Sequence, residues 1–294
     1  MLDLALCIFS SSLIFVIFKL FKVYKVQTLY AIIVNYITAF TVGIISFEGS
    51  LNFKAIPGEP WFAGALALGV LFIIVFNLMA QTSQKLGVSV ASVATKMSLA
   101  IPVLFGVFFY KEDLGNIKVI GILLALAAVY FASVREKSIV LKRDSLLLPL
   151  LVFIGSGIID VSIKYFEATL VSEIAFPLFT AFVFGSAAIS GLIFILIRLP
   201  KTPLKLNIRN IIGGIVLGVP NFFSIFFLLR ALQHKSLNSA SVFTINNVAI
   251  VMFTTLLGIL LFKERISSKN WAGITMAVIS IILVALGDDL YDIL

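Results

Sequence analysis

Residues 88–110 read VSVASVATKMSLAIPVLFGVFFY, an apolar stretch that is long enough to cross a lipid bilayer as a helix. Lys96 lies about a third of the way along this stretch, at a depth of about 12 Å below the nearer membrane surface. A cation at that depth is costly in lipid, so its side chain is expected to face protein or a water-filled cavity. A second stretch of the same kind, residues 240–262, carries Asn246 and Asn247 in its interior. We expect the rest of the chain to be arranged around these two helices.

The composition of the 294-residue chain is that of a polytopic membrane protein. Hydrophobic residues make up 61% of the chain and charged residues only 12%, about half of the charged fraction of soluble domains. The net charge of +8 is carried by short loops, without the interleaved aromatic residues of nucleic-acid-binding domains. The charge therefore indicates membrane orientation and contact with anionic lipids, and no nucleic-acid partner is expected.

Hydropathy divides the chain into ten apolar spans, each of a length that suits a membrane helix. They cover approximately residues 2–21, 28–47, 60–84, 88–110, 116–134, 146–167, 174–198, 208–233, 237–262 and 269–287. Only helices and closed barrels satisfy the backbone in lipid, and these spans are too long and too continuously apolar for barrel strands. The sequence thus predicts an all-α polytopic membrane protein with ten transmembrane helices.

Several residues recur at a fixed offset along the chain, which indicates an internal duplication. The identical pairs include Ser89 and Ser241, Leu104 and Leu256, Gly106 and Gly258, Lys111–Glu112 and Lys263–Glu264, and Gly121–Ile122 and Gly273–Ile274. Five helices per half is an odd number, so the second half must enter the membrane in the opposite sense. We therefore predict two inverted five-helix repeats, residues 1–138 and 139–294, with a binding site near the membrane midplane where the repeats meet.

The fourth helix of each half shows the same order of features. These stretches are ASVATKMSLAIPVLFGVFFYKE at 91–112, and SASVFT at 239–244 leading to GILLFKERI at 258–266. Each begins with small residues, continues with an apolar core and ends with an acidic residue, Glu112 or Glu264. Pro102 in the first helix is replaced by Thr254 in the second. In these motifs the chain resembles the EamA family of the drug/metabolite transporter superfamily, over essentially its whole length.

The resemblance implies a secondary transporter that moves a small organic metabolite, an amino acid or a drug-like compound by alternating access. We expect an anionic or zwitterionic substrate, a bacterial cytoplasmic membrane and a functional monomer, with a dimer as the alternative. A passive channel and a structural membrane protein whose polar residues only hold helices together are the competing functions. The sequence shows no phosphate-binding loop, metal-ligand cluster or serine–histidine–acid set, so neither an enzyme nor a cofactor is expected.

Polar residues inside the apolar helices are the candidates for substrate contact. At helical spacing Ser89, Ser92 and Lys96 fall on one stripe of the first helix, and repeat-related polar residues form a stripe on the second. The predicted substrate-binding residues are Lys96, Ser92, Ser89, Asn246, Asn247, Thr244, Asn77 and Asn221. Lys96 is expected to bind an anionic group such as a carboxylate. The alternatives are a structural ion pair with Asp160 and a side chain that snorkels to the surface.

A further set of ionisable residues is predicted to couple or gate transport, namely Asp160, Lys164, Lys19, Glu112 and Glu264. Asp160 lies four residues before Lys164, so an ion pair within one helix is one interpretation. The other is a protonatable carboxylate that couples transport to protons. For Glu112 and Glu264 the alternative to a gate is simple anchoring of helix ends at the membrane surface.

The sequence supports two opposite orientations of the chain in the membrane. Most loop lysines and arginines lie on the face opposite to the two termini, so the positive-inside rule predicts that both termini are outside the cell. The resemblance to the superfamily implies cytoplasmic termini instead.

Overall fold

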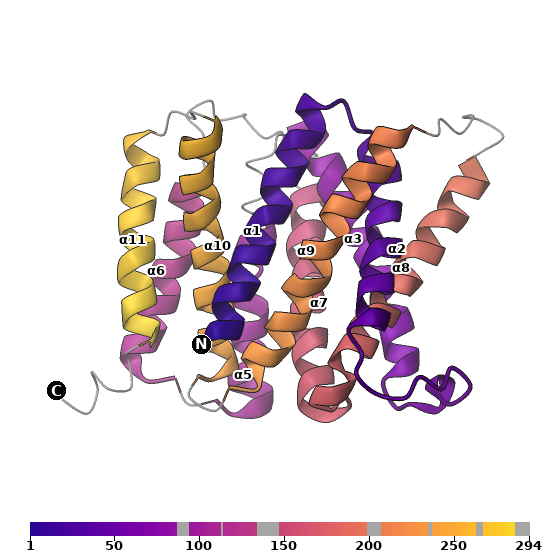
Figure 1. Cartoon of the computed structure of the whole chain (residues 1–294). Helices are drawn as coiled ribbons and strands as arrows, with labels where there is room; N and C mark the ends of the chain where they lie inside the picture. Colours follow the sequence, from indigo (N-terminus) through magenta and orange to yellow (C-terminus); the bar gives the residue numbers. More distant parts are fainter. Residues whose placement is uncertain are drawn as a thin grey trace. The chain divides into compact units, whose positions relative to one another are not determined.

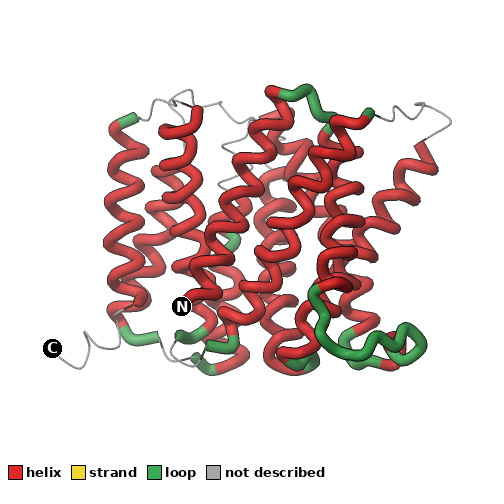
Figure 2. Tube along the Cα trace, viewed as in Figure 1, coloured by secondary structure: helices red, strands yellow, loops and turns green. Residues whose placement is uncertain are grey.

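The chain is all-helical throughout the part that the structure describes. The structure is a computed structural model and describes residues 1–86, 94–112, 114–133, 147–198, 207–234, 237–262 and 267–285. Figure 2 shows helices and the loops between them, among which the loop of residues 46–61 is long, and no strand occurs within these ranges. In chain order the α-helices, labelled as in Figure 1, are α1 (Leu2–Val23), α2 (Thr28–Ile45), α3 (Phe62–Leu86), α5 (Ala100–Tyr110), α6 (Asn116–Ser133), α7 (Leu147–Thr169), α8 (Phe176–Arg198), α9 (Ile208–Leu232), α10 (Ser239–Phe262) and α11 (Ser268–Ala285). The structure also contains two short 3-10 helices, Ile56–Gly58 and Glu173–Ala175.

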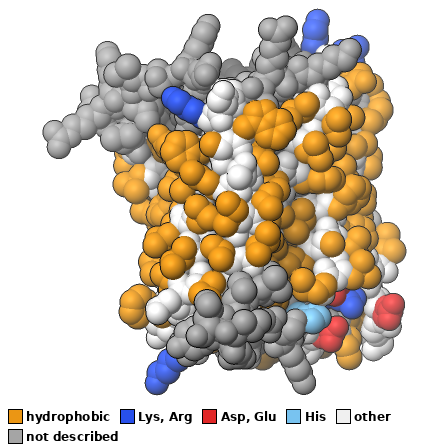
Figure 3. All heavy atoms as spheres, turned by 90° about the vertical axis from the view of Figure 1, so that its left-hand side faces the viewer, with side chains coloured by type: hydrophobic (Ala, Val, Ile, Leu, Met, Phe, Trp, Pro, Cys, Tyr) orange, Lys and Arg blue, Asp and Glu red, His pale blue; other side chains and the backbone are white. Residues whose placement is uncertain are grey.

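Within the described ranges, ten apolar helices confirm the predicted all-α membrane architecture. Seven of them are long and apolar enough to cross a membrane, judged by length and composition, and the other three are shorter apolar helices. Large hydrophobic side chains are exposed along them, for example Leu123 on α6 and Ile279 on α11. Figure 3 shows hydrophobic side chains covering the middle of one face, with charged side chains near its two ends. This distribution suits a lipid environment, in which exposed apolar surface carries no cost.

By its internal contacts the chain divides into two compact units, and each draws on both halves of the sequence. The first unit comprises Met1, Val75–Lys164 and Ala231–Leu294, and the second comprises Leu2–Ile74 and Tyr165–Arg230. The first unit thus holds α5, α6, α10, α11, most of α7 and the second part of α3. The predicted boundary between the repeats, at residues 138 and 139, lies outside the described residues.

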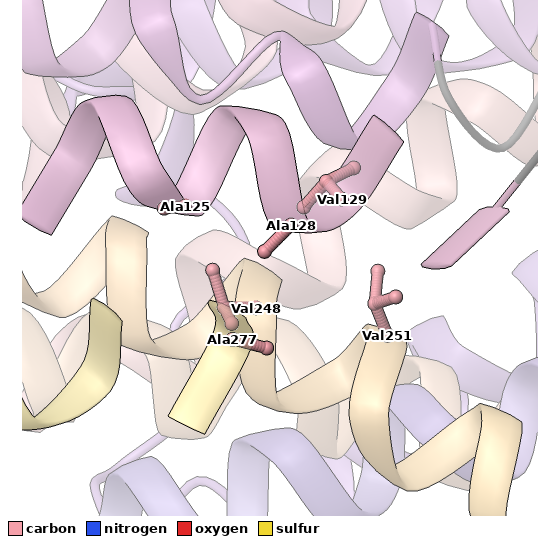
Figure 4. Close-up of a cluster of buried hydrophobic side chains, with 6 residues drawn as sticks. All are labelled: Ala125, Ala128, Val129, Val248, Val251 and Ala277. Carbon is pink, nitrogen blue, oxygen red and sulfur yellow. The ribbon is translucent and has the colours of Figure 1, made fainter. Parts of the chain in front are cut away.

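In the first unit, α6 packs along α11, and α10 packs against α5, α6 and α11 (Figure 1). The core of this contact, drawn in Figure 4, consists of the small and β-branched side chains of Ala125, Ala128, Val129, Val248, Val251 and Ala277. The backbones approach closely at Gly121, where an added Cβ would lie 2.7 Å from Cγ2 of Val284. Ser280 also donates a hydrogen bond to the Gly121 carbonyl oxygen at 2.7 Å. Small residues and interhelical hydrogen bonds are what holds helices together in lipid.

In the second unit, α2 packs against α8, and glycines of α9 allow α9 to approach α2. An added Cβ would lie 2.7 Å from the Ala31 carbonyl oxygen at Gly214, and 2.7 Å from the Asn35 carbonyl oxygen at Gly218. The space is therefore filled by backbone, and no side chain fits at either glycine.

Candidate functional site

The site begins with the buried Lys96 of the first unit. Its side chain is only 8% exposed, and Nζ donates a hydrogen bond to Oδ1 of Asn247 at 3.2 Å. Asn247 in turn donates from Nδ2 to the Phe243 carbonyl oxygen at 3.0 Å, which fixes the amide with its oxygen toward the lysine. Lys96 belongs to the first half of the sequence and Asn247 to the second. The structure thus brings together the two polar positions that the sequence singled out.

The helix that carries Lys96 is interrupted, although the sequence predicted one continuous span over residues 88–110. Ala94–Met97 are helical, Ser98 and Leu99 form a turn, and α5 begins at Ala100. Pro102 contributes to the interruption, because it has no N–H to donate to the Ser98 carbonyl. That carbonyl accepts a bond from the Ile101 N–H instead, at 2.9 Å. In α10, where Thr254 replaces the proline, the helix is continuous.

Asp160 approaches the lysine from α7. The charge of Asp160 interacts with that of Lys96. The helices meet closely here, because an added Cβ at Gly157 would lie 2.7 Å from Cβ of Ile101 on α5. A buried cation and a half-buried carboxylate that interacts with it therefore lie close to the Asn247 amide. Such an environment can bind an anionic group, a cationic group or both.

Lys164 lies one turn further along α7 and contacts the other end of α5. Its Nζ lies 5.5 Å from the centroid of the Tyr110 ring, within the range of a cation–π interaction. The side chain is half-buried. Asp160 and Lys164 of α7 thus have separate neighbours in the first unit, Lys96 for Asp160 and Tyr110 for Lys164.

The other polar residues of α10 are also buried. Thr244 is fully buried and donates to the Ala240 carbonyl oxygen of its own helix at 2.7 Å, and Asn246 is 6% exposed. The hydroxyl of Ser241, which is 1% exposed, has no hydrogen-bond partner among the described residues. A buried polar group without a protein partner is costly, and a water molecule or a substrate group normally satisfies it.

Sequence reasoning missed Ser156 on α7. Its hydroxyl is buried and, within the described part of the chain, has no hydrogen-bond partner. The signal was present, because Ser156 lies four residues before Asp160 and so on the same face of the helix. Ser156 therefore joins the candidate substrate contacts of the first unit.

The remaining predicted substrate residues have different locations. Asn77 is half-buried on α3 in the first unit. Asn221 belongs to the second unit and donates from Nδ2 to Oδ1 of Asn35 at 3.1 Å, a contact between α9 and α2. Ser89 and Ser92 lie outside the described residues.

The predicted coupling and gating residues are likewise distributed. Lys19 is half-buried on α1 in the second unit, and Glu264 lies outside the described residues. Glu112 is half-buried in the first unit and binds the start of α10. Its Oε1 accepts hydrogen bonds from the backbone N–H of Ser239 at 3.1 Å and from the hydroxyl of Ser239, and its Oε2 accepts from the Ala240 N–H at 3.1 Å.

Comparisons with known proteins agree with this architecture. Residues 2–134 and 145–286 each match the model of the EamA-like transporter family. An uncharacterized protein of Haemophilus influenzae is similar to the chain, with 31% identity over 259 residues that cover 85% of this chain and 86% of the relative. A crystal structure of a protein has a similar fold, with a TM-score of 0.74 at 15% identity over 97% of this chain and 98% of that chain. At this identity the second likeness supports the fold alone.

Proposed function

Because the chain belongs to the EamA-like transporter family, a family of multi-pass membrane proteins that move small molecules, we propose that it is a secondary transporter for small organic anions or zwitterions. Lys96 binds the anionic group of the substrate. The observation that carries the proposal is the buried hydrogen bond between Lys96 and Asn247, next to the helix interruption at Ser98 and Leu99. Discontinuous helices of this kind surround the midplane sites of other transporter folds.

The chemistry of the lysine favours a carboxylate. An ammonium group has three N–H donors, so Lys96 can bind the Asn247 amide and a carboxylate oxygen at the same time. Hydrogen bonds between charged partners are shorter and stronger than those to neutral groups. The unpartnered hydroxyls of Ser156 and Ser241 offer further donors in the same unit of the described chain.

Asp160 gives the same site a role in coupling. In the free protein its carboxylate balances the charge of Lys96, with which it interacts. When a substrate carboxylate binds Lys96, the site holds two anions and one cation. A proton, or the ammonium group of a zwitterion, then restores the balance. Lys164 on the same helix and Lys19 on α1 are further candidates for coupling.

We place the protein in the cytoplasmic membrane of a bacterium. The similar protein from Haemophilus influenzae, a bacterium, supports this placement. A single chain is the proposed functional unit. The family implies transport, and saturable exchange of substrate distinguishes such a transporter from a passive channel.

Thermal-shift measurements on the purified protein test the binding proposal. The ligands are L-amino acids and short-chain carboxylates, each paired with the amide that replaces its carboxylate. A carboxylate in hundredfold excess over its Kd should stabilise the native state by about 2.7 kcal/mol and raise the Tm, and its amide should not. Lys96→Gln should abolish the shift. Lys54→Gln, a change at an exposed loop residue, is the matched control.

A shift that persists in Lys96→Gln would show that another residue binds the ligand. Equal shifts by carboxylates and their amides would exclude an anion site.

A further inference from the structure

Glu112, which follows the end of α5, contacts the start of α10. Its two carboxylate oxygens accept three hydrogen bonds, from the backbone N–H groups of Ser239 and Ala240 and from the Ser239 hydroxyl. The Ser241 N–H donates to Oδ1 of Asn238 at 2.9 Å. The first N–H groups of a helix have no partner within the helix, so these contacts complete the N-terminus of α10.

The burial of this helix start makes the contact hard to replace. Ser239 is 3% exposed and Ala240 is fully buried. The surrounding protein therefore shields both residues, and loss of the carboxylate would remove the protein partner of their N–H groups. The negative charge of Glu112 also interacts favourably with the positive N-terminal end of the α10 dipole.

The end of α5 holds Glu112 in place. Lys111 adopts a left-handed backbone conformation with φ of 51°, and the Glu112 N–H donates to the Gly106 carbonyl oxygen at 3.2 Å. An added Cβ at Gly106 would lie 2.8 Å from Oε2 of Glu112 and 3.1 Å from Oγ of Ser239. Only a glycine at this position lets the carboxylate and Ser239 lie against α5 together.

Of the two helices joined in this way, α10 carries Asn247 and α5 follows the segment that carries Lys96. α10 runs without interruption from Ser239 to Phe262, so Asn247 follows the capped end by about two turns. α5 directly follows the short turn after Lys96. A helix shifts as a rigid rod over this length, so a displacement at Ser239 moves Asn247 as well.

We propose that Glu112 is a positioning residue for substrate binding. By capping α10 from the end of α5, it sets the depth at which Asn247 lies against Lys96. The inference rests on the proposed function, because it assigns Glu112 an effect on the affinity of that same site. It differs from a gate, which would change the rate of transport and leave the affinity unchanged.

Kinetics in proteoliposomes test the inference, with the carboxylate that gives the largest thermal shift as the transported probe. Glu112→Ala should raise KM about tenfold and leave Vmax within about twofold of the wild type. Glu112→Asp should recover part of the affinity, since it keeps the carboxylate. Gly106→Ala should also raise KM, because the added methyl group displaces the carboxylate. Glu48→Gln, at an exposed acidic residue, is the matched control and should behave as the wild type.

Hydrogen exchange checks the contact without a substrate. Exchange of the Ser239 and Ala240 amides should be slow in the wild type and at least tenfold faster in Glu112→Ala, with the rest of α10 protected. Unchanged exchange, an unchanged KM, or a lower Vmax at constant KM would each overturn the inference. Absence of saturable flux in the wild type would instead count against the proposed function and everything that rests on it.

Discussion

At the scale of single residues, the energetics of Lys96 decide how the site works. A lysine near the centre of a membrane helix costs about 3 kcal/mol. A hydrogen bond between helices in a membrane contributes about 0.6 to 2 kcal/mol, so the bond to Asn247 offsets only part of that cost. The charge of Asp160 interacts with that of Lys96 and further lowers the cost in the free protein. The same balance predicts that an incoming carboxylate competes with Asp160 for the lysine.

Asp160→Asn tests this competition. Removal of the carboxylate should lower the Tm of the free protein and strengthen the binding of simple carboxylates by about tenfold, since their competitor is gone. Zwitterions should bind more weakly, because they lose the partner of their ammonium group. Thermal-shift titrations with each ligand class measure both effects. Weaker binding of both classes would show that Asp160 acts only as a structural partner.

At the scale of elements, the helix interruption between Met97 and Ala100 shows which features the sequence could predict and which it could not. Hydropathy predicted the helix, and the repeat showed that Pro102 has no counterpart in α10. Proline alone does not decide the outcome, because Pro220 lies within α9 and leaves that helix continuous. Whether neighbouring residues can hydrogen-bond the backbone groups that a proline leaves unpaired depends on tertiary contacts. A local sequence pattern does not contain this information.

Pro102→Ala should restore the missing backbone hydrogen bond and make the helix continuous past Lys96. We expect a higher Tm together with weaker substrate binding, of about tenfold, because Lys96 leaves its position beside Asn247. Thermal melting and proteoliposome kinetics measure the two effects. Pro220→Ala is the control within a continuous helix. An unchanged KM in Pro102→Ala would show that the interruption has no part in binding.

The contact between α2 and α9 gives a prediction about stability. At Gly218 an added Cβ meets the Asn35 carbonyl oxygen at 2.7 Å, and backbone cannot move aside as a flexible side chain does. Gly218→Ala should therefore destabilise the protein by about 2 kcal/mol. Gly58→Ala is the control, because an added Cβ there meets no atom within 4 Å. Equal melting temperatures of the two variants would contradict the assigned packing.

At the scale of the whole molecule, composition and hydropathy were enough to predict ten helices, and the resemblance carried by the motifs at 91–112, 239–244 and 258–266 indicated the transporter family. They also singled out Lys96 and Asn247, which the structure joins by a hydrogen bond. The contacts of Glu112 with α10 and of Asn221 with Asn35 did not follow from the sequence. A glutamate at the end of an apolar span has the same local pattern whether it is solvated or caps a distant helix. An asparagine within an apolar span does not reveal which helix it binds.

Substrate counterflow in proteoliposomes tests the central claim most directly. The wild type and Lys54→Gln should exchange a labelled carboxylate for the unlabelled one with saturable kinetics, and its amide should neither be transported nor compete. Lys96→Gln should lose at least about tenfold in Vmax/KM, and the ligand-free protein should melt at a lower temperature, because Asp160 loses the cation that balances its charge. Wild-type kinetics in Lys96→Gln would contradict the claim that Lys96 binds the substrate.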